Sequence, residues 1–142
     1  MSGFTLAEVL TVLVVMVVLV ALAIPMWRNH VLRVQRTEGR AALFAIQTAE
    51  DRFFGQHARY ASGAEIAAPP PEGLGIKAAS ERGYYDLDVR TSGDGLAFTA
   101  TARSGKKGSD SDPRCVEFSL DQNGRRRARD SQGNDRSADC WS

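Results

Sequence analysis

The first part of the chain is an almost unbroken run of apolar residues. Between Phe4 and Trp27 the one charged residue is Glu8. An α-helix rises about 1.5 Å per residue, so a helix over this run would measure about 36 Å, enough to cross a hydrocarbon core of about 30 Å. The pattern therefore predicts a membrane-spanning helix that carries a single carboxylate near its start.

Beyond Trp27 the apolar residues recur at three- and four-residue spacing, which is typical of an amphipathic helix. We expect this second half to cover residues 28–55 and to end at Gly55. Gly39 lowers the stability of this helix by about 1 kcal/mol relative to alanine. We therefore expect either local melting or close packing at this position. Glu50 and Asp51 are expected on its solvent surface. The predicted apolar stripe consists of Trp27, Val31, Val34, Ala41, Ala42, Ala45, Ala49 and Phe53.

The second half of the chain shows the period-two alternation of strands. A proline-rich connector over residues 56–83 is followed by four expected strands near residues 84–89, 96–102, 115–120 and 125–129, with turns at 92–95 and at Asn123-Gly124. A sheet of four strands needs a cover on one face, and the amphipathic helix supplies it. The predicted fold is α+β, a long helix on a small antiparallel sheet. The predicted core consists of Tyr84 or Tyr85, Leu87, Val89, Phe98, Val116, Phe118 and Leu120.

Glu8 is energetically unfavourable in a membrane-spanning helix. An ionisable side chain in hydrocarbon costs about 2.5–3.5 kcal/mol unless it finds a partner. One interpretation places Glu8 in the headgroup layer, where its negative charge favours the start of a helix. The other is that Glu8 meets a cation supplied by another chain.

The stretch Gly3-Phe4-Thr5-Leu6-Ala7-Glu8, followed by an apolar helix, resembles the class III signal of type IV prepilins and of type II secretion pseudopilins. The resemblance implies that prepilin peptidase cuts between Gly3 and Phe4 and that Phe4 becomes N-methylated. It also implies that Glu8 pairs with the N-terminal amine of a neighbouring subunit in the filament, which would give the carboxylate its partner. Pro25 falls where the family kinks its helix.

The head contains the two cysteines, Cys115 and Cys140, and a disulfide is the expected state of an exported domain. Together with the Asn123-Gly124 turn and the terminal Cys140-Trp141, they are similar to the head of PilE-like minor pilins of type IV pili. In those proteins the two cysteines bracket a C-terminal loop. Pseudopilins generally lack this disulfide, so a type II secretion pseudopilin is the alternative. The expected segments are leader 1–3, membrane and filament-core helix 4–27, amphipathic helix 28–55, connector 56–83 and head 84–142.

A run of arginines over residues 125–129 is the strongest local charge feature in a chain whose formal net charge is only +1. On a strand, Arg125, Arg127 and Arg129 would point to one side. Lys106 and Lys107 could join them if the two loops meet. Such a row could bind DNA phosphates, which would suit a pilin that serves competence. A charged edge strand that keeps the protein soluble is the competing interpretation.

The charges that flank the apolar helix conflict with a pilin. The basic residues all follow the helix, so the positive-inside rule would place the head in the cytoplasm. We therefore expect the true start codon upstream of Met1. The basic residues that follow directly are Arg28, Arg33, Arg36 and Arg40.

The sequence contains no motif of an enzyme, cofactor or metal site, and a catalytic role for His57 or a calcium site among the head's aspartates is disfavoured. The resemblance to type IV pilins implies a minor, or else major, pilin that serves pilus biogenesis and pilus-dependent motility, adhesion or DNA uptake. Its expected partners are other pilin subunits, prepilin peptidase, the inner-membrane assembly machinery and, in the competence alternative, DNA. It is expected in the inner membrane as a precursor with a periplasmic head, and then in a cell-surface pilus.

Overall fold

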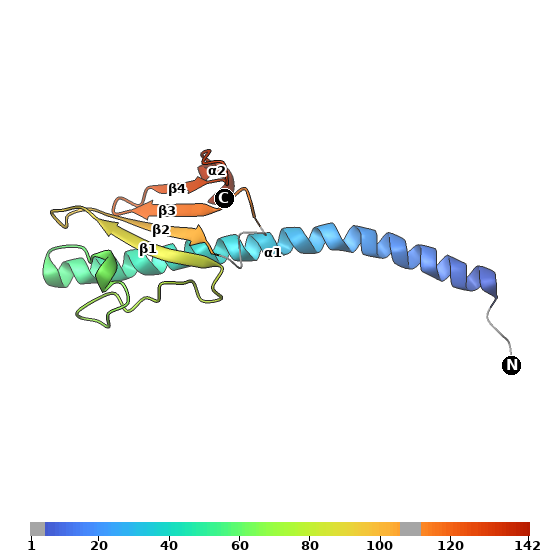
Figure 1. Cartoon of the computed structure of the whole chain (residues 1–142), viewed down its shortest axis with the longest axis horizontal. Coiled ribbons are helices and arrows are strands. Elements are labelled where there is room, and N and C mark those ends of the chain that lie inside the picture. Colours follow the sequence, from blue (N-terminus) through green and yellow to red (C-terminus); the bar gives the residue numbers. More distant parts are fainter. Residues whose placement is uncertain (1–4, 106–111) are drawn as a thin grey trace. The chain divides into compact units, whose positions relative to one another are not determined.

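A computed structural model describes residues 5–105 and 112–142, and gives the backbone alone for residues 25, 26, 28 and 29 (Figure 1). The processing site Gly3-Phe4 and the loop lysines Lys106 and Lys107 lie outside the described residues. Pro25 lies within the N-terminal helix, and the kink expected there stays a prediction. The chain divides into two compact units, Met1–Val34 and Gln35–Ser142, which are treated separately below.

The first unit is the N-terminal part of helix α1, which spans Leu6–His57. Thr5 caps its start, because the N–H of Glu8 donates to the Thr5 hydroxyl at 3.3 Å. Within it, Leu6–Ile24 has a mean hydropathy of 2.9 and is long and apolar enough to cross a membrane, judged by length and composition. None of this window is buried by the rest of the chain. A long apolar helix with no cover from its own chain needs a membrane or other chains around it.

The second unit contains a four-stranded antiparallel sheet in the order β1-β2-β3-β4, which lies along the C-terminal part of α1 (Figure 1). The register places Leu87 opposite Ala102, Ala102 opposite Phe118, and Phe118 opposite Ala128, so one row of side chains faces the helix. The α+β prediction of a long helix on a four-stranded sheet is confirmed. The strands are β1 Tyr85–Thr91, β2 Phe98–Ser104, β3 Glu117–Asp121 and β4 Arg126–Arg129.

The core lies between this sheet and the buried face of α1. Tyr85 rather than Tyr84 is buried, and Val116 is only half-buried because β3 begins after it. The remaining predicted strand positions are buried. They are Leu87, Val89, Phe98, Phe118 and Leu120.

The predicted stripe on the helix was right at Ala49 and Phe53, which are buried, and wrong at Ala41 and Ala45. Ala41 and Ala45 are exposed, whereas Leu43 and Ile46 are fully buried. Burial of a large aliphatic side chain stabilises by about 1.5–3 kcal/mol, far more than burial of an alanine methyl group, so the larger residues decide which face turns inward. The expectation that Glu50 lies on the surface was also wrong, because Glu50 shares the buried face and is 0% exposed.

The helix also ends later than predicted. It passes through Gly55 to His57, and Ala58 ends it with a left-handed φ of 55° and an N–H that donates to the Phe54 carbonyl at 2.8 Å. A Cβ at Gly55 would meet nothing within 4 Å, whereas a Cβ at Gly39 would lie 3.0 Å from Cε2 of the buried Tyr85 ring. Gly39 therefore serves close packing, one of the two roles expected for it.

These two glycines give a matched pair of predictions. Gly55→Ala should raise the free energy of unfolding by about 0.5–1 kcal/mol, because it restricts the unfolded chain at no steric cost. Gly39→Ala should lower it by about 1 kcal/mol, because overpacking against Tyr85 outweighs the gain in helix propensity. Denaturant unfolding of the full chain in detergent, followed by tryptophan fluorescence, measures both. Equal stabilisation by the two substitutions would contradict the close contact between Gly39 and Tyr85.

Candidate functional site

The apolar part of α1 has one charged group, the carboxylate of Glu8. Glu8 is exposed and borders a shallow hollow together with Val9, Val12 and Leu13. In the part of the chain that the structure describes, no cation forms an ion pair with it. Among the described residues its immediate surroundings are thus apolar.

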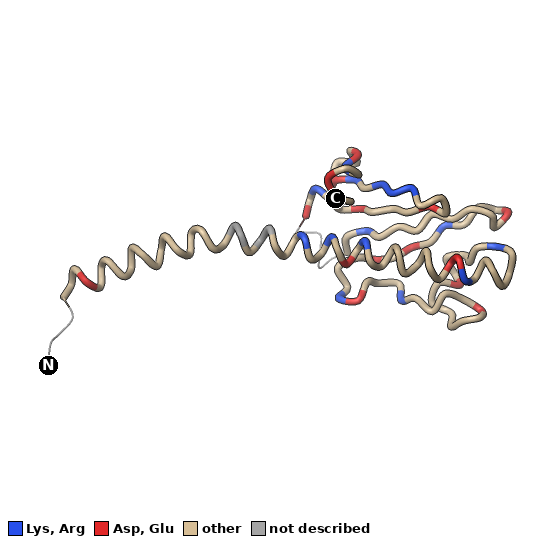
Figure 2. The backbone as a smooth tube through the Cα atoms, turned by 180° about the vertical axis from the view of Figure 1, so that it is seen from behind, with Lys and Arg blue, Asp and Glu red and all other residues tan. Residues whose placement is uncertain are grey.

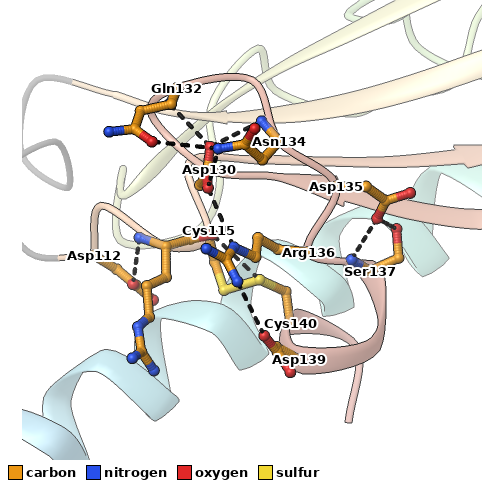
Figure 3. Close-up of polar contacts among 11 residues, drawn as sticks. Asp112, Cys115, Asp130, Gln132, Asn134, Asp135, Arg136, Ser137, Asp139 and Cys140 are labelled. Atoms are coloured by element: carbon orange, nitrogen blue, oxygen red, sulfur yellow. Dashed lines mark hydrogen bonds and ion pairs between the residues drawn. A yellow bond between two sulfur atoms is a disulfide. The ribbon is translucent and has the colours of Figure 1, made fainter.

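A disulfide closes the C-terminal end of the head. Cys115 and Cys140 are bonded with a Cα–Cα distance of 5.9 Å, and both are almost fully buried (Figure 3). Cys140 ends the short helix α2, Ser137–Cys140. The bond joins the segment before β3 to the last turn of the chain, so it holds the residues after β4 against the sheet.

The loop inside the disulfide covers the edge of β4. The N–H of Arg136 donates to the Ala128 carbonyl at 2.8 Å, and the N–H of Ala128 donates to the Ser137 hydroxyl at 2.9 Å. Asp135 positions that hydroxyl, which donates to its carboxylate at 2.6 Å. Both backbone groups of Ala128 are therefore occupied, which blocks strand pairing with another chain at this point.

Asp130 organises the same loop. Its carboxylate accepts hydrogen bonds from the N–H groups of Gln132 and Asn134 at 2.9 Å each and from Arg136 Nε at 3.2 Å (Figure 3). Desolvation opposes ionisation, but the bonds from Asn134, Arg136 and Gln132 outweigh it and lower the pKa of Asp130 to about 2. Among the described residues, no group of three or more His, Cys, Asp or Glu side chains is placed to hold a metal ion.

The arginine run separates into three parts. Arg127 and Arg129 are exposed on the outer face of β4, whereas Arg125 precedes the strand and its N–H donates to Asp121 Oδ1 at 2.9 Å. Arg126 lies on the same side of the strand as the buried Ala128. Figure 2 shows the basic run along the strand beside the C-terminus. The structure thus brings two of the three proposed DNA-contacting arginines to one face of the strand.

Carboxylates partly offset this positive charge. Arg129 lines a trough on the outer face of the sheet that also contains Asp86 and Glu117, and Glu117 pairs with Arg103 at 2.7 Å. The pKa of Asp135 is lowered, first by hydrogen bonds from Ser137 and then by the charges of Arg127 and Arg129. Arg125, Arg127 and Arg129 form no ion pair with a carboxylate in the described part of the chain, so their guanidinium groups are available to an anion.

The residue of this run that the sequence interpretation missed is Arg126. Its guanidinium carbon lies 5.0 Å from the ring centroid of Phe44 and 5.6 Å from that of Trp141. Trp141 in turn donates its indole N–H to the Arg127 carbonyl at 2.9 Å and packs edge-on against Phe118. These cation–π contacts join β4 to α1 through Phe44 and to the end of the chain through Trp141. The alternation along the strand predicts that Arg126 points away from Arg125, Arg127 and Arg129, but it does not identify the aromatic partners of Arg126.

Two of the arginines that follow the apolar part of α1 contact the head. Arg36 Nε lies 2.5 Å from the buried Asp112 carboxylate, and Arg40 Nη1 donates to the Ser142 carbonyl at 2.7 Å. These contacts give Arg36 and Arg40 a structural role within the second unit.

A protein-family model matches more than half of the chain. Residues 25–119 match the family model described as "Type IV minor pilin ComP, DNA uptake sequence receptor". The chain is 34% identical over 95 residues to "Type IV major pilin protein PilA" of Myxococcus xanthus (strain DK1622), an alignment that covers 65% of this chain and 42% of that protein. The chain thus spans less than half the length of this relative. A solved structure, "High-Resolution Structure of a Type IV Pilin from Shewanella oneidensis", aligns with 66% of this chain and 88% of that one, at a TM-score of 0.47 and 21% identity.

Proposed function

The chain belongs to the ComP family of type IV minor pilins, and on that premise we propose that it is a structural subunit of a type IV pilus, assembled through its N-terminal helix. The observation that carries the proposal is the window Leu6–Ile24, in which Glu8 is the one charged residue and of which nothing is buried in the described part of the chain. In a precursor the lipid bilayer would cover this surface. In a filament, the helices of neighbouring copies would cover it.

The proposed route starts at the N-terminus. Prepilin peptidase cuts between Gly3 and Phe4, Phe4 is N-methylated, and the inner-membrane assembly machinery moves the subunit into the filament. Glu8 pairs there with the N-terminal amine of a neighbouring copy, and Pro25 marks the kink of the helix. The head faces the periplasm in the precursor and the cell surface in the pilus.

The experiment is to shear filaments from the cell surface and to assay them for this chain with an antibody against the head. The proposal predicts the chain in the filament fraction, and a precursor in the membrane fraction. A chain that stays in the membrane while filaments form around other pilins would contradict it. The disulfide Cys115–Cys140 favours a pilus over the type II secretion pseudopilus that is the alternative.

DNA binding is a second candidate function, favoured by the DNA-receptor description of the matching family. In this chain the supporting feature is the set Arg125, Arg127 and Arg129, whose guanidinium groups are exposed and unpaired with described carboxylates. Phosphate contacts release counterions and make binding dependent on salt. The nearby Asp135 opposes a strong field, so we expect modest affinity.

The corresponding prediction concerns retention on duplex DNA between about 50 and 200 mM salt. Replacing Arg125, Arg127 and Arg129 by Gln should weaken retention. The slope of log affinity against log salt should become shallower by about 0.9 for each phosphate that the protein no longer neutralises. A matched variant removes three exposed charges elsewhere, at Arg52, Lys77 and Arg82. Equal effects of the two triple variants would show a non-specific response to net charge and would rule out a DNA surface on β4.

A further inference from the structure

Glu50 has a fully buried carboxyl group. It takes no part in the proposed assembly through Leu6–Ile24 or in the proposed DNA contact at β4. It lies on the inner face of α1 between Ile46 and Phe53, one turn from each, and is 0% exposed. Its Oε2 accepts the N–H of Ala61 at 2.8 Å, whereas its Oε1 is buried without a hydrogen-bond partner in the described part of the chain. A buried oxygen without a partner is rare, because its lost hydration is not replaced.

Ala61, the hydrogen-bond partner of Glu50, and its neighbour Tyr60 also form hydrogen bonds with the sheet and its first hairpin turn. The Ala61 carbonyl accepts the hydroxyl of Thr91 at the end of β1 at 2.6 Å. The N–H of the neighbouring Tyr60 donates to Gly95, in the turn between β1 and β2, at 2.8 Å. Residues 60–62 therefore connect the helix, the first strand and the first hairpin turn. Two contacts link them to the helix, the hydrogen bond from Ala61 to Glu50 and the packing of the Tyr60 ring on Phe54, with ring centroids 4.7 Å apart.

The charges around Glu50 come from its own helix and from the segment after it. Asp51 lies on the helix, Arg59 and Glu65 lie on the segment, and the latter two pair with each other at 2.7 Å. From β1, this network receives only the uncharged hydroxyl of Thr91 among the described contacts. Desolvation raises the pKa of Glu50 to about 7. The Ala61 N–H and Arg59 oppose the rise, while Glu65 and Asp51 add to it.

We propose that Glu50 is a proton-controlled latch: its neutral carboxyl holds residues 60–62 against the helix, and its ionisation loosens them. A buried carboxylate with one unpartnered oxygen costs much more than a neutral carboxyl in the same place. Opening the segment admits water to the charge and removes that cost. The inference does not depend on the assignment of the protein to a pilus.

The sign follows from the direction of the pKa shift. The pKa of Glu50 is about 7 in the closed state and near 4.5 when exposed to water. The closed state therefore binds more protons, its extra stability is fully present below about pH 4.5, and it is lost as pH rises through about 7. Between about pH 5.5 and 8.5, these two values predict an increase of about 30-fold in the opening equilibrium of the segment.

The test is native-state hydrogen exchange of the full chain in detergent micelles, with rates corrected for the intrinsic effect of pH. The protection factor of the Ala61 amide should fall by about 30-fold between about pH 5.5 and 8.5 in the natural chain. It should stay constant in Glu50→Gln, whose neutral amide can still accept the Ala61 N–H. The control Asp51→Asn removes the exposed carboxylate next along the helix and should leave the fall in place.

A second measurement needs no substitution and remains decisive if Glu50→Gln folds poorly. The side-chain carboxyl ¹³C resonance of Glu50 should titrate with a midpoint near 7 in the natural chain. A midpoint near 4.5, or a protection factor at Ala61 that does not change with pH, would overturn the latch. Loss of the pH response in Asp51→Asn as well as in Glu50→Gln would also overturn it, because the response would then not belong to the buried carboxyl.

Discussion

Replacing Glu8 by Gln should lower incorporation of the subunit into filaments by about 100-fold. In the proposed filament, the Glu8 carboxylate neutralises the N-terminal amine of a neighbour inside an apolar core. Removing one partner of a buried ion pair leaves the other charged and unpaired, at a cost of about 3–5 kcal/mol. Because about 1.4 kcal/mol corresponds to a factor of ten, even the lower value exceeds a hundredfold loss.

The amount of the variant in sheared filaments, divided by its amount in the membrane fraction, measures this loss. Insertion in the membrane should persist, because Gln is no more costly in hydrocarbon than a charged Glu. Glu72→Gln makes the same chemical change on the exposed connector and should assemble normally. If the Glu8 variant assembles as well as the Glu72 variant, the carboxylate has no role in assembly.

Removing the disulfide should have the largest effect on the stability of the head. Replacing both Cys115 and Cys140 by Ala should lower the free energy of unfolding by about 3–4 kcal/mol. This is the chain-entropy value for a bridge between residues 25 positions apart. The loop from Asp130 to Cys140 should loosen first, and the backbone groups of Ala128 would then become available at the edge of the sheet.

Chemical unfolding of the full chain in detergent, with and without dithiothreitol, tests this prediction. Reduction should destabilise the natural chain by a similar amount and should leave the double variant unchanged. The second comparison is the control for other effects of the reductant. A natural chain whose unfolding midpoint is the same before and after reduction would show that the bridge does not stabilise the head.

The sequence was sufficient for the elements whose pattern is local. The apolar run before Trp27, the alternation from Tyr85 to Val89 and the Asn123-Gly124 turn each require only neighbouring residues. They placed the helix and the four strands along the chain, although the strand bounds differ by one or two residues from the predicted ones. The buried strand residues followed from the same alternation.

Contacts between distant segments could not be predicted from the sequence. The Tyr85 ring packs closely over Gly39, and the Arg126 guanidinium lies over the rings of Phe44 and Trp141. No local pattern in the sequence indicates these pairings. The phase of the helix could have been found, because Leu43 and Ile46 outweigh the alanines in apolar area. That phase would also have placed Glu50 on the buried face.

The mass of the N-terminal peptide of this chain, taken from purified surface filaments, tests the proposed assembly most directly. The predicted peptide begins at Phe4 and carries one additional methyl group on its amine. Its detection would show that the apolar helix is the processed and assembled end of a pilus subunit. A peptide that still contains Gly3, found in filaments from cells with an active prepilin peptidase, would contradict the proposed function.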